Sequence, residues 1–312
     1  MQFFERVFNE SDIILTEGAF VERLKSEYKL PLDEDLNHAG LLYSHPETLE
    51  SLYRQYIDVG QKHLLPLMLM TPTRKLNAES HKRSKYHQKD IVADSCSFLN
   101  TIRDSYGSYS QKIMLGGFMG CKGDAYSSKD ALGTEEARKF HQFQCHQFQK
   151  QSVDFLFAGI MPEIHEATGM ALAMAETGIP YIISFMIRKD GCLLDGTSIS
   201  DAIALIDDAV ETPPVCYMTN CVHPANLRQA LQSDRNYNRP ELKRFKGIQA
   251  NASALSPEEL NNCGILKQDD FGAMINEMQN LYDTYKLKIF GGCCGTNDVF
   301  LNDLASVLEN NR

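Results

Sequence analysis

The sequence predicts a (β/α)8 barrel that forms a single α/β domain over residues 1–312. Eight short apolar runs recur along the chain, and segments with helical periodicity lie between them. Eight strands that alternate with helices over a chain of about this length are typical of such a barrel. A doubly wound open sheet is the alternative, and the absence of a glycine-rich dinucleotide motif after the first run weakens it.

Most of the apolar runs are continuous rather than alternating, as expected for strands that are buried on both faces of a parallel sheet. The predicted strands lie within DIILTEG from Asp12, HLLPLMLMTP from His63, KIMLGGFM from Lys112, DFLFAGI from Asp154, PYIISFMI from Pro180, PVCYMTNC from Pro214, GIQANAS from Gly247 and LKIFGGCCG from Leu287. The carboxyl ends of these strands form the rim on which the active sites of such barrels lie.

Good helix formers with helical periodicity fill several intervals between the runs. The predicted helices lie within residues 133–152, 162–176, 198–210 and 270–285. Thr134 and Ser256 each stand shortly before glutamates, which is a pattern typical of helix N-caps. The long polar stretch 75–109 is predicted to form a helix with loops.

The composition is that of an ordinary soluble protein, with 43% hydrophobic and 23% charged residues. The net charge of −10 and the lack of a basic block argue against nucleic-acid and anionic membrane partners. No apolar stretch is long enough to span a membrane, and the first ten residues carry charges where a signal peptide is apolar. We therefore expect a cytoplasmic protein.

Three of the nine cysteines fall at predicted strand ends on one rim. Cys221 ends the sixth run, and Cys293 and Cys294 end the eighth run. An odd, scattered set without an export signal favours reduced thiols, metal ligation or catalysis over disulfides. The ends of the two strands are expected on the order of 10 Å apart, a gap that loop residues close around one ion. The remaining six are expected to be structural or surface residues, namely Cys96, Cys121, Cys145, Cys192, Cys216 and Cys263.

Three thiolates at a barrel mouth suit a catalytic zinc ion, which keeps one coordination position open. Gly291, Gly292 and Gly295 are expected to permit the sharp bend that points adjacent cysteines at one ion. The alternative is that these are buried apolar cysteines, which are common. His223 is a less favoured fourth ligand, since a histidine before a helix-entry proline is more often a cap.

The ligand set itself indicates a chemistry. A zinc centre with three thiolates carries net negative charge, so it is poorly suited to activating water and well suited to a substrate thiol. Coordination lowers the thiol pKa from about 8.5, so that a thiolate is present at neutral pH. That thiolate can attack an activated methyl group. The sequence therefore predicts alkyl transfer to sulfur.

The segments around these cysteines resemble the two zinc motifs of the zinc-dependent homocysteine S-methyltransferases. They are NCVHP from Asn220 and GGCCGT from Gly291. The segments LTEGAFVERL, TPTRKLN, GFMGCKGDAY and LLDGTSI are also similar to family segments, so the resemblance covers nearly the whole chain. It implies a (β/α)8 barrel, Zn²⁺ on Cys221, Cys293 and Cys294, and methyl transfer from a sulfonium or quaternary ammonium donor to homocysteine, giving methionine. S-methylmethionine, S-adenosylmethionine and betaine are the donors to consider.

The resemblance also suggests substrate and donor contacts. The substrate contacts expected are Glu17, Gly18, Thr71, Glu163 and Asn251, and the donor contacts expected are Thr73, Arg74 and Phe185. No catalytic side chain is expected beyond the zinc-activated substrate thiol. Arg74 and Lys75 replace a neutral pair, so they either recognise an anionic donor or acceptor or face solvent.

Two departures from the family pattern concern the amino group of homocysteine. Glu17 stands where the family has an aspartate, and Gly159 stands where it has a second amino-binding carboxylate. Glu163 could substitute for the missing group, although a glutamate at a helix start is more often a cap. If another thiol is the acceptor, Gly159→Glu is expected to improve the use of homocysteine.

Three functional hypotheses remain open at this point. The chain is a homocysteine S-methyltransferase, a methyltransferase for a different small thiol, or a non-catalytic barrel that binds zinc or a thiol. The long C-terminal arm that accompanies betaine-type tetramers in the family is missing after the eighth run. We therefore expect a sulfonium donor and a monomer or simple homo-oligomer.

Overall fold

The computed structural model describes residues 1–261 and 270–310. Eight parallel strands close into one barrel in chain order, with each strand paired to the next and β8 paired to β1. The strands are β1 (Ile14–Thr16), β2 (Leu67–Met70), β3 (Ile113–Gly120), β4 (Phe155–Met161), β5 (Tyr181–Phe185), β6 (Cys216–Val222), β7 (Phe245–Ala250) and β8 (Ile289–Gly292). The predicted (β/α)8 barrel is confirmed.

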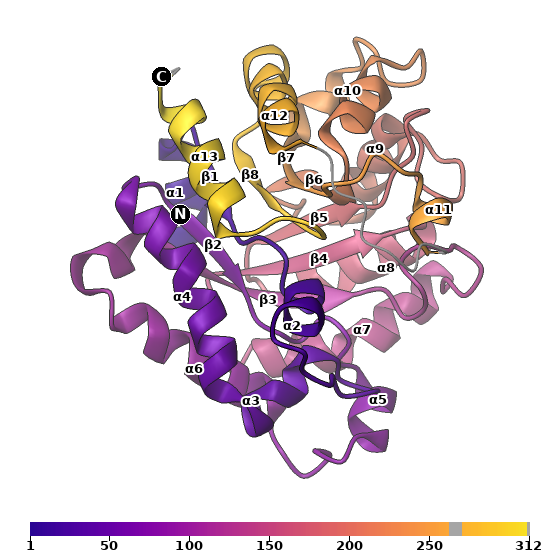
Figure 1. The fold of residues 1–312 in the computed structure, drawn as a ribbon. Helices are drawn as coiled ribbons and strands as arrows, with labels where there is room; N and C mark the ends of the chain where they lie inside the picture. Colours follow the sequence, from indigo (N-terminus) through magenta and orange to yellow (C-terminus); the bar gives the residue numbers. More distant parts are fainter. Residues whose placement is uncertain (262–269, 311–312) are drawn as a thin grey trace.

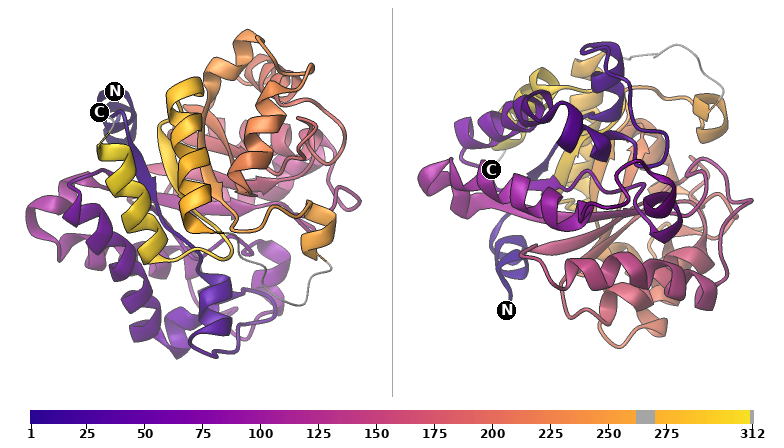
Figure 2. Two further views of the ribbon diagram at one scale, coloured as in Figure 1. Left: turned by 45° about the horizontal axis from the view of Figure 1, so that its top comes forward. Right: turned by 90° about the horizontal axis from the view of Figure 1, so that it is seen from below.

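Helices surround the strands, as the three views in Figures 1 and 2 show. The α-helices are α1 (Phe3–Glu10), α2 (Val21–Ser26), α3 (Leu41–Ser44), α4 (Pro46–Lys62), α5 (Ala78–Arg83), α6 (Ile91–Asp104), α7 (Thr134–Phe148), α8 (Ile164–Ala175), α9 (Ile199–Ala209), α10 (Pro224–Gln232), α11 (Pro257–Asn261), α12 (Phe271–Tyr285) and α13 (Asp298–Glu309). Short 3-10 helices are η1 (His38–Gly40), η2 (Gly107–Lys112) and η3 (Pro240–Arg244). Among the helices of the described residues, none has both the length and the apolar character needed to cross a membrane.

The apolar core has two parts. The larger part lies between the outer faces of the strands and the helices around them. The smaller part combines strand residues such as Met68, Phe155 and Met218 with Phe4 and Phe8 of α1. The rings of Phe4 and Phe155 stack with their centroids 4.5 Å apart. Because α1 covers the strand residues at this end, the amino-terminal end of the barrel is closed and the opposite rim is left for a site.

The strands agree with the sequence predictions, with small shifts at their ends. Strand β7 begins at Phe245, two residues before the predicted run, and the four predicted helices correspond to α7, α8, α9 and α12. Ser256 caps α11 as expected, since its hydroxyl accepts the backbone N–H of Glu259 at 3.3 Å. Thr134 is instead the first residue of α7, with Gly133 at the N-cap. The polar stretch 75–109 contains two helices, α5 and α6, rather than one.

Candidate metal and substrate site

The three predicted sulfur ligands meet at the carboxyl-terminal rim of the barrel. The Sγ atoms of Cys221, Cys293 and Cys294 all lie within 4.8 Å of one another. Cys221 Sγ is 2.6 Å from that of Cys293 and 3.7 Å from that of Cys294. Strand β6 supplies the first cysteine, and the turn after β8 supplies the other two. One ion at their centre would be within reach of all three.

Cys221 is aimed at its partners by a distortion of β6. Its backbone has a φ of +63°, and the β6–β7 register shifts between Asn220 and Val222. A matching irregularity occurs in β4, where Ile160 has a φ of +58°. The side chain of Asn220 joins the two, because its Oδ1 accepts the backbone N–H of Ile160 at 2.9 Å and the Ser184 hydroxyl at 2.7 Å. Such bulges re-aim side chains, and here the strained backbone turns a sulfur toward β8.

The turn that carries the paired cysteines is fixed by its two neighbouring strands. The Cys293 N–H donates to the Ala250 carbonyl at 2.7 Å, and the Gly292 N–H donates to the Glu17 carbonyl at 3.0 Å. The Thr296 hydroxyl donates to the Cys293 carbonyl at 2.7 Å. The backbone of this turn is therefore set before any ion binds.

The expectation that the glycines supply dihedrals forbidden to other residues holds at Gly295 and not at Gly291 or Gly292. Gly295 has a φ of +81°, which few residues with a side chain adopt. Gly292 has no such φ, and a Cβ there would overlap the side chain of Thr296 instead. The turn that carries the adjacent thiols therefore depends on the left-handed backbone of Gly295 and on the close approach of threonine side chains to Gly291 and Gly292.

The electrostatics of the trio fit a bound cation. The pKa of the Cys221 thiol is lowered well below its usual value by hydrogen bonds with Cys293 and Cys294. The pKa values of Cys293 and Cys294 are raised, chiefly by their hydrogen bonds with Cys221. Without a cation, ionisation of the Cys221 thiol thus raises the pKa values of the other two thiols, which stay protonated. A metal ion supplies the positive charge that lets all three ionise, and soft thiolates suit zinc.

A cavity of about 280 Å³ opens beside the sulfurs. It is lined by residues from the segment after β1 and the start of α2, from the loops after β2 and β3, and from the carboxyl-terminal ends of β3, β4, β6, β7 and β8. Glu17 is part of this lining and is 7% exposed, and its Oε2 accepts the backbone N–H of Met70 at 3.0 Å. Burial raises the pKa of Glu17 to about 8, against the smaller opposing effect of that hydrogen bond. The cavity therefore holds a carboxyl group that is poised to ionise when a cation binds.

The loop between β3 and α7 closes one side of the cavity. The Tyr126 hydroxyl donates to the Cys221 sulfur at 3.2 Å, and the pKa of Tyr126 is raised, mainly by the negative charge at Cys221. Both ends of this loop are anchored by Glu166, which is fully buried. Its carboxylate accepts the backbone N–H of Lys122 at 2.7 Å and that of Leu132 at 3.3 Å. A side chain of α8 therefore positions Tyr126 against one of the three clustered cysteines.

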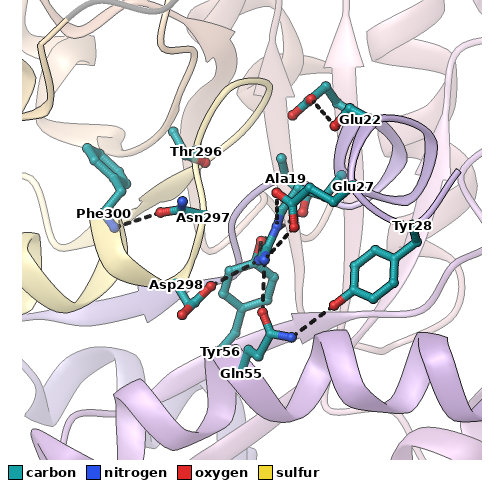
Figure 3. A network of polar contacts seen from close by, with 12 residues as sticks. Ala19, Glu22, Glu27, Tyr28, Gln55, Tyr56, Thr296, Asn297, Asp298 and Phe300 are labelled. Carbon is teal, nitrogen blue, oxygen red and sulfur yellow. Dashed lines mark hydrogen bonds and ion pairs between the residues drawn. The ribbon is translucent and has the colours of Figure 1, made fainter.

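A second anchor ties the β1 loop to the turn after β8. Figure 3 shows Tyr56 and Gln55 of α4 directed toward the same centre as Glu27 and Asp298. At that centre lies Arg23, whose guanidinium is 2.9 Å from Glu27 and 3.2 Å from Asp298 at the first turn of α13.

The same guanidinium reaches the loop that carries Glu17. Arg23 donates to the Tyr56 hydroxyl at 3.2 Å, and that hydroxyl donates to the Ala19 carbonyl at 2.7 Å. A side chain at Gly18 would collide with the ring of Tyr56, since a Cβ there would lie 2.8 Å from its hydroxyl oxygen. Arg23 thus holds the segment bearing Glu17 and the helix that follows Cys294 in one fixed arrangement.

The position of the missing carboxylate is filled by an aromatic ring. A Cβ at Gly159 would overlap the ring of Phe118, and Phe118 lines the cavity. The expectation that Gly159→Glu alone restores an amino-binding group therefore needs correction. The glutamate would require Phe118 to move, because the space that its first carbon needs is already occupied.

The predicted substrate and donor contacts are brought together only in part. Glu17, Gly18 and Arg74 line the cavity. Thr71 and Thr73 are buried, with hydroxyls 2.8 Å apart that bond to the backbone of Phe118.

Three other predicted contacts lie outside the lining of the cavity. Asn251 contacts the site indirectly, since its Nδ2 lies 3.6 Å from the Cys221 sulfur. Phe185 is fully buried against Tyr217, with ring centroids 5.6 Å apart. Glu163 caps α8 by accepting the backbone N–H of Glu166 at 2.8 Å.

Several site residues were missed by the sequence analysis. Tyr126, Phe118, His38 and Gln249 line the cavity, although none stood out in the sequence. Tyr126 and Phe118 both lie within the segment GFMGCKGDAY, and its resemblance to a family loop was the available signal. His38 and Gln249 had no comparable signal, because neither stands in a recognisable pattern.

The remaining histidine and cysteine predictions can be compared with the structure as well. His223 is the N-cap of α10, and its Nδ1 accepts the backbone N–H of Ala225 at 3.2 Å, so the capping role is confirmed. Five other cysteines are buried away from the trio, namely Cys96, Cys121, Cys145, Cys192 and Cys216. Cys263 lies outside the described residues.

Comparison with known proteins gives the family. The family profile "Homocysteine S-methyltransferase" matches residues 14–308. The chain belongs to the homocysteine S-methyltransferase family. It is therefore a methyltransferase, as the resemblance of its cysteine motifs implied. No curated protein matches the sequence.

The fold is similar to that of the homocysteine methyltransferase MmuM from Escherichia coli. Its oxidized form is 17% identical, with a TM-score of 0.77 over 99% of this chain and 100% of that chain. Its metallated form is 18% identical, with a TM-score of 0.76 over 98% of this chain and 99% of that chain. At this identity the likeness concerns the fold.

Proposed function

We propose that this chain is a zinc-dependent S-methyltransferase that moves a methyl group from a sulfonium donor to homocysteine, giving methionine. The observation that carries the proposal is the cluster of three sulfurs within 4.8 Å at the mouth of a cavity that also holds a carboxyl group. Cys221, Cys293 and Cys294 would hold the ion. Bound zinc with three protein thiolates keeps a position for a substrate thiol and lowers its pKa, so that it is ionised at neutral pH.

Glu17 is the group that would orient the acceptor. It is neutral near pH 7 in the empty cavity because its pKa is about 8. A substrate ammonium beside it favours the ionised form, so binding would release a proton from Glu17. Because the site is buried, the resulting ion pair is screened less than a surface pair. Glu17 would thereby fix the amino end while the sulfur end faces the cysteines.

The transfer itself needs no further acid or base from the chain. The acceptor thiol loses its proton to solvent, and its sulfur attacks the methyl carbon of the donor. The new S–C bond forms as the donor S–C bond breaks, and that electron pair stays on the donor sulfur. Both products are neutral thioethers at the reacting sulfurs. Tyr126 would hold Cys221 in place through its 3.2 Å hydrogen bond, and the rings of Phe20 and Phe118 would shield the donor cation from water.

The metal content of matched variants tests the proposal. Wild type and Cys96→Ser are expected to bind about one zinc per chain, since Cys96 lies in α6 outside the trio. Cys293→Ser is expected to lose most of the zinc and the turnover of homocysteine with S-methylmethionine, while its circular dichroism spectrum stays unchanged. Full activity in metal-depleted Cys293→Ser would contradict the proposal.

A second candidate is a methyltransferase for a different small thiol. It is favoured by the ring of Phe118, which occupies the space where a side chain at Gly159 would begin. A panel of thiols with and without an α-amino group, assayed with S-methylmethionine, S-adenosylmethionine and betaine, separates the candidates. Turnover restricted to thiols without the amino group would favour this second function. Thiol binding without turnover of any donor would leave a non-catalytic barrel.

We also propose that the protein works in the cytoplasm as a monomer or simple homo-oligomer. Light scattering of the purified protein and fractionation of cells that produce it would check both points.

A further inference from the structure

The cavity carries groups of opposite charge on two sides of the barrel mouth. The thiols belong to β6 and to the turn after β8, and Glu17 and Glu22 follow β1 beside them. Arg74 and Lys75 follow β2 and also line the cavity. In a closed barrel of eight strands β2 faces β6, so these cations lie across the mouth from Cys221.

The side chain of Arg74 extends along the end of β3. A Cβ at Gly120 would lie 2.8 Å from Arg74 Cγ, which places the arginine stem against the last residue of that strand. The β3 end faces β7, the strand between the two that supply the sulfurs. The stem of Arg74 therefore lies against β3, on the side of the barrel opposite β7.

No acidic side chain in the described ranges, 1–261 and 270–310, pairs with Arg74. This arginine is half-buried, and it makes no hydrogen bond or ion pair with any residue that the structure describes. Arg83 and Arg188, by contrast, are paired with Asp35 and Glu258. A guanidinium that is partly removed from water without an anion is unfavourable, so a ligand anion would be stabilising there.

The groups around Arg74 do not neutralise it. Burial and the charge of Arg74 lower the pKa of His38 to about 3, so that imidazole is neutral. Burial raises the pKa of Cys121 to about 12, so that thiol is neutral as well. Asp124 lies near Lys75 and raises the pKa of that lysine, against the larger lowering by burial. Among the described residues that line this wall of the cavity, Asp124 is the carboxylate and Arg74 and Lys75 are the cations.

We propose that Arg74 binds the carboxylate of the methyl donor, and this inference rests on the function proposed above. The charge order of the cavity runs from thiolates on one wall to a guanidinium on the other. A donor that carries its onium centre at one end and a carboxylate at the other matches this order. Its methyl group would face the acceptor sulfur, and its carboxylate would face Arg74.

The acceptor is anchored elsewhere. Its sulfur would face the three cysteines and its ammonium would face Glu17, and these groups belong to β6 and to the segments that follow β8 and β1. The wall that carries Arg74 is left for the second substrate. The aromatic rings of Phe118 and Tyr126 also line the cavity and suit the onium cation that must lie between the two ends.

Two donors that share the same reacting group test the inference. S-methylmethionine carries a carboxylate, whereas trimethylsulfonium does not. For Arg74→Gln we expect the KM for S-methylmethionine to rise on the order of 10- to 100-fold, as expected for loss of a charge-assisted pair. The KM for homocysteine is expected to stay within twofold, and kcat/KM for trimethylsulfonium is expected to be unchanged. Arg74→Lys should recover part of the loss.

Control variants and a binding measurement separate the possible failures. Arg83→Gln removes an exposed arginine of α5 and is expected to match wild type with both donors. An equal loss with both donors, or a rise in the KM for homocysteine alone, would overturn the role of Arg74. If the donor is a quaternary ammonium compound, betaine, which carries a carboxylate, and tetramethylammonium, which does not, provide the same comparison.

If the wild type turns over no thiol, the proposed function fails, and calorimetry then tests Arg74 by itself. Binding of S-methylmethionine to the zinc-loaded wild type that is lost in Arg74→Gln supports the inference. Equal binding by both proteins, or no binding by either, contradicts it.

Discussion

Replacing Arg23 tests whether the network in Figure 3 positions the metal ligands. Arg23 is 6% exposed, and its guanidinium lies 2.9 Å from Glu27, 3.2 Å from Asp298 and 3.2 Å from the Tyr56 hydroxyl. Arg23→Met keeps most of the apolar stem and removes every one of these bonds. The segments bearing Glu17 and the paired cysteines would then be joined only through their backbones.

The magnitude follows from how exposed the partners are. The side chains of Glu27 and Asp298 are 46% and 33% exposed, so water can replace part of what each loses. Arg23→Met is therefore expected to lower the free energy of unfolding by about 2 kcal/mol, which is less than the roughly 3–5 kcal/mol lost when a fully buried pair is broken. The share that falls on the Asp298 contact is that of one partly buried ion pair, about 1.4 kcal/mol, which corresponds to roughly tenfold in zinc affinity.

Competition with a chromogenic chelator measures that affinity. Arg23→Met and Asp298→Asn are each expected to weaken zinc binding about tenfold, and the double variant is expected to show little additional loss. Arg228→Met is a matched control, because Arg228 joins α10 to α12 through Glu277 at 2.7 Å without touching the site. Its zinc affinity should equal that of wild type. Zinc affinity within twofold of wild type in Arg23→Met would refute the positioning role.

Three further predictions concern residues of the cavity and its loop. Glu17 is neutral in both the folded and the unfolded protein below pH 4.5, so its burial as the neutral form costs no stability there. Its pKa in the metal-free fold is about 8, so the free energy of unfolding should fall by up to about 1.4 kcal/mol per pH unit between pH 4.5 and about pH 8. Urea unfolding at several pH values should show that slope in wild type and not in Glu17→Gln. Gly159→Glu alone should leave the KM for homocysteine no better, whereas Gly159→Glu with Phe118→Ala should lower it; an improvement in the single variant would contradict the overlap. Glu166→Gln should lower kcat/KM about tenfold by loosening the loop that carries Tyr126, and an unchanged kcat/KM would contradict that anchoring.

The fold was predictable because its signals are local. Each strand is a short apolar run that is buried on both faces, so it can be located in the sequence without knowing which strands it pairs with. Helix α1 was not predicted, since its charged residues hid the face formed by Phe4 and Phe8. The cap at Thr134 was misplaced by one residue, because Gly133 takes that position without any side-chain bond.

The cluster of three cysteines was predictable for a similar reason. A pair of cysteines among glycines and a third cysteine at another strand end are visible in the sequence, and the barrel brings them to one rim. The residues that surround the sulfurs were harder to predict from the sequence. Phe118 fills the space beside Gly159, and Tyr126 reaches Cys221 from a loop. Both depend on how segments distant in sequence pack, which composition and spacing do not encode.

Zinc K-edge X-ray absorption on the metal-loaded protein tests the central claim most directly. We predict three sulfur neighbours at about 2.3 Å in the absence of substrate and four after homocysteine is added. The extra sulfur would be the substrate thiol bound beside Cys221, Cys293 and Cys294. A first shell with fewer than three sulfurs, or one in which no sulfur is gained with homocysteine or any other thiol of the panel, would contradict the account.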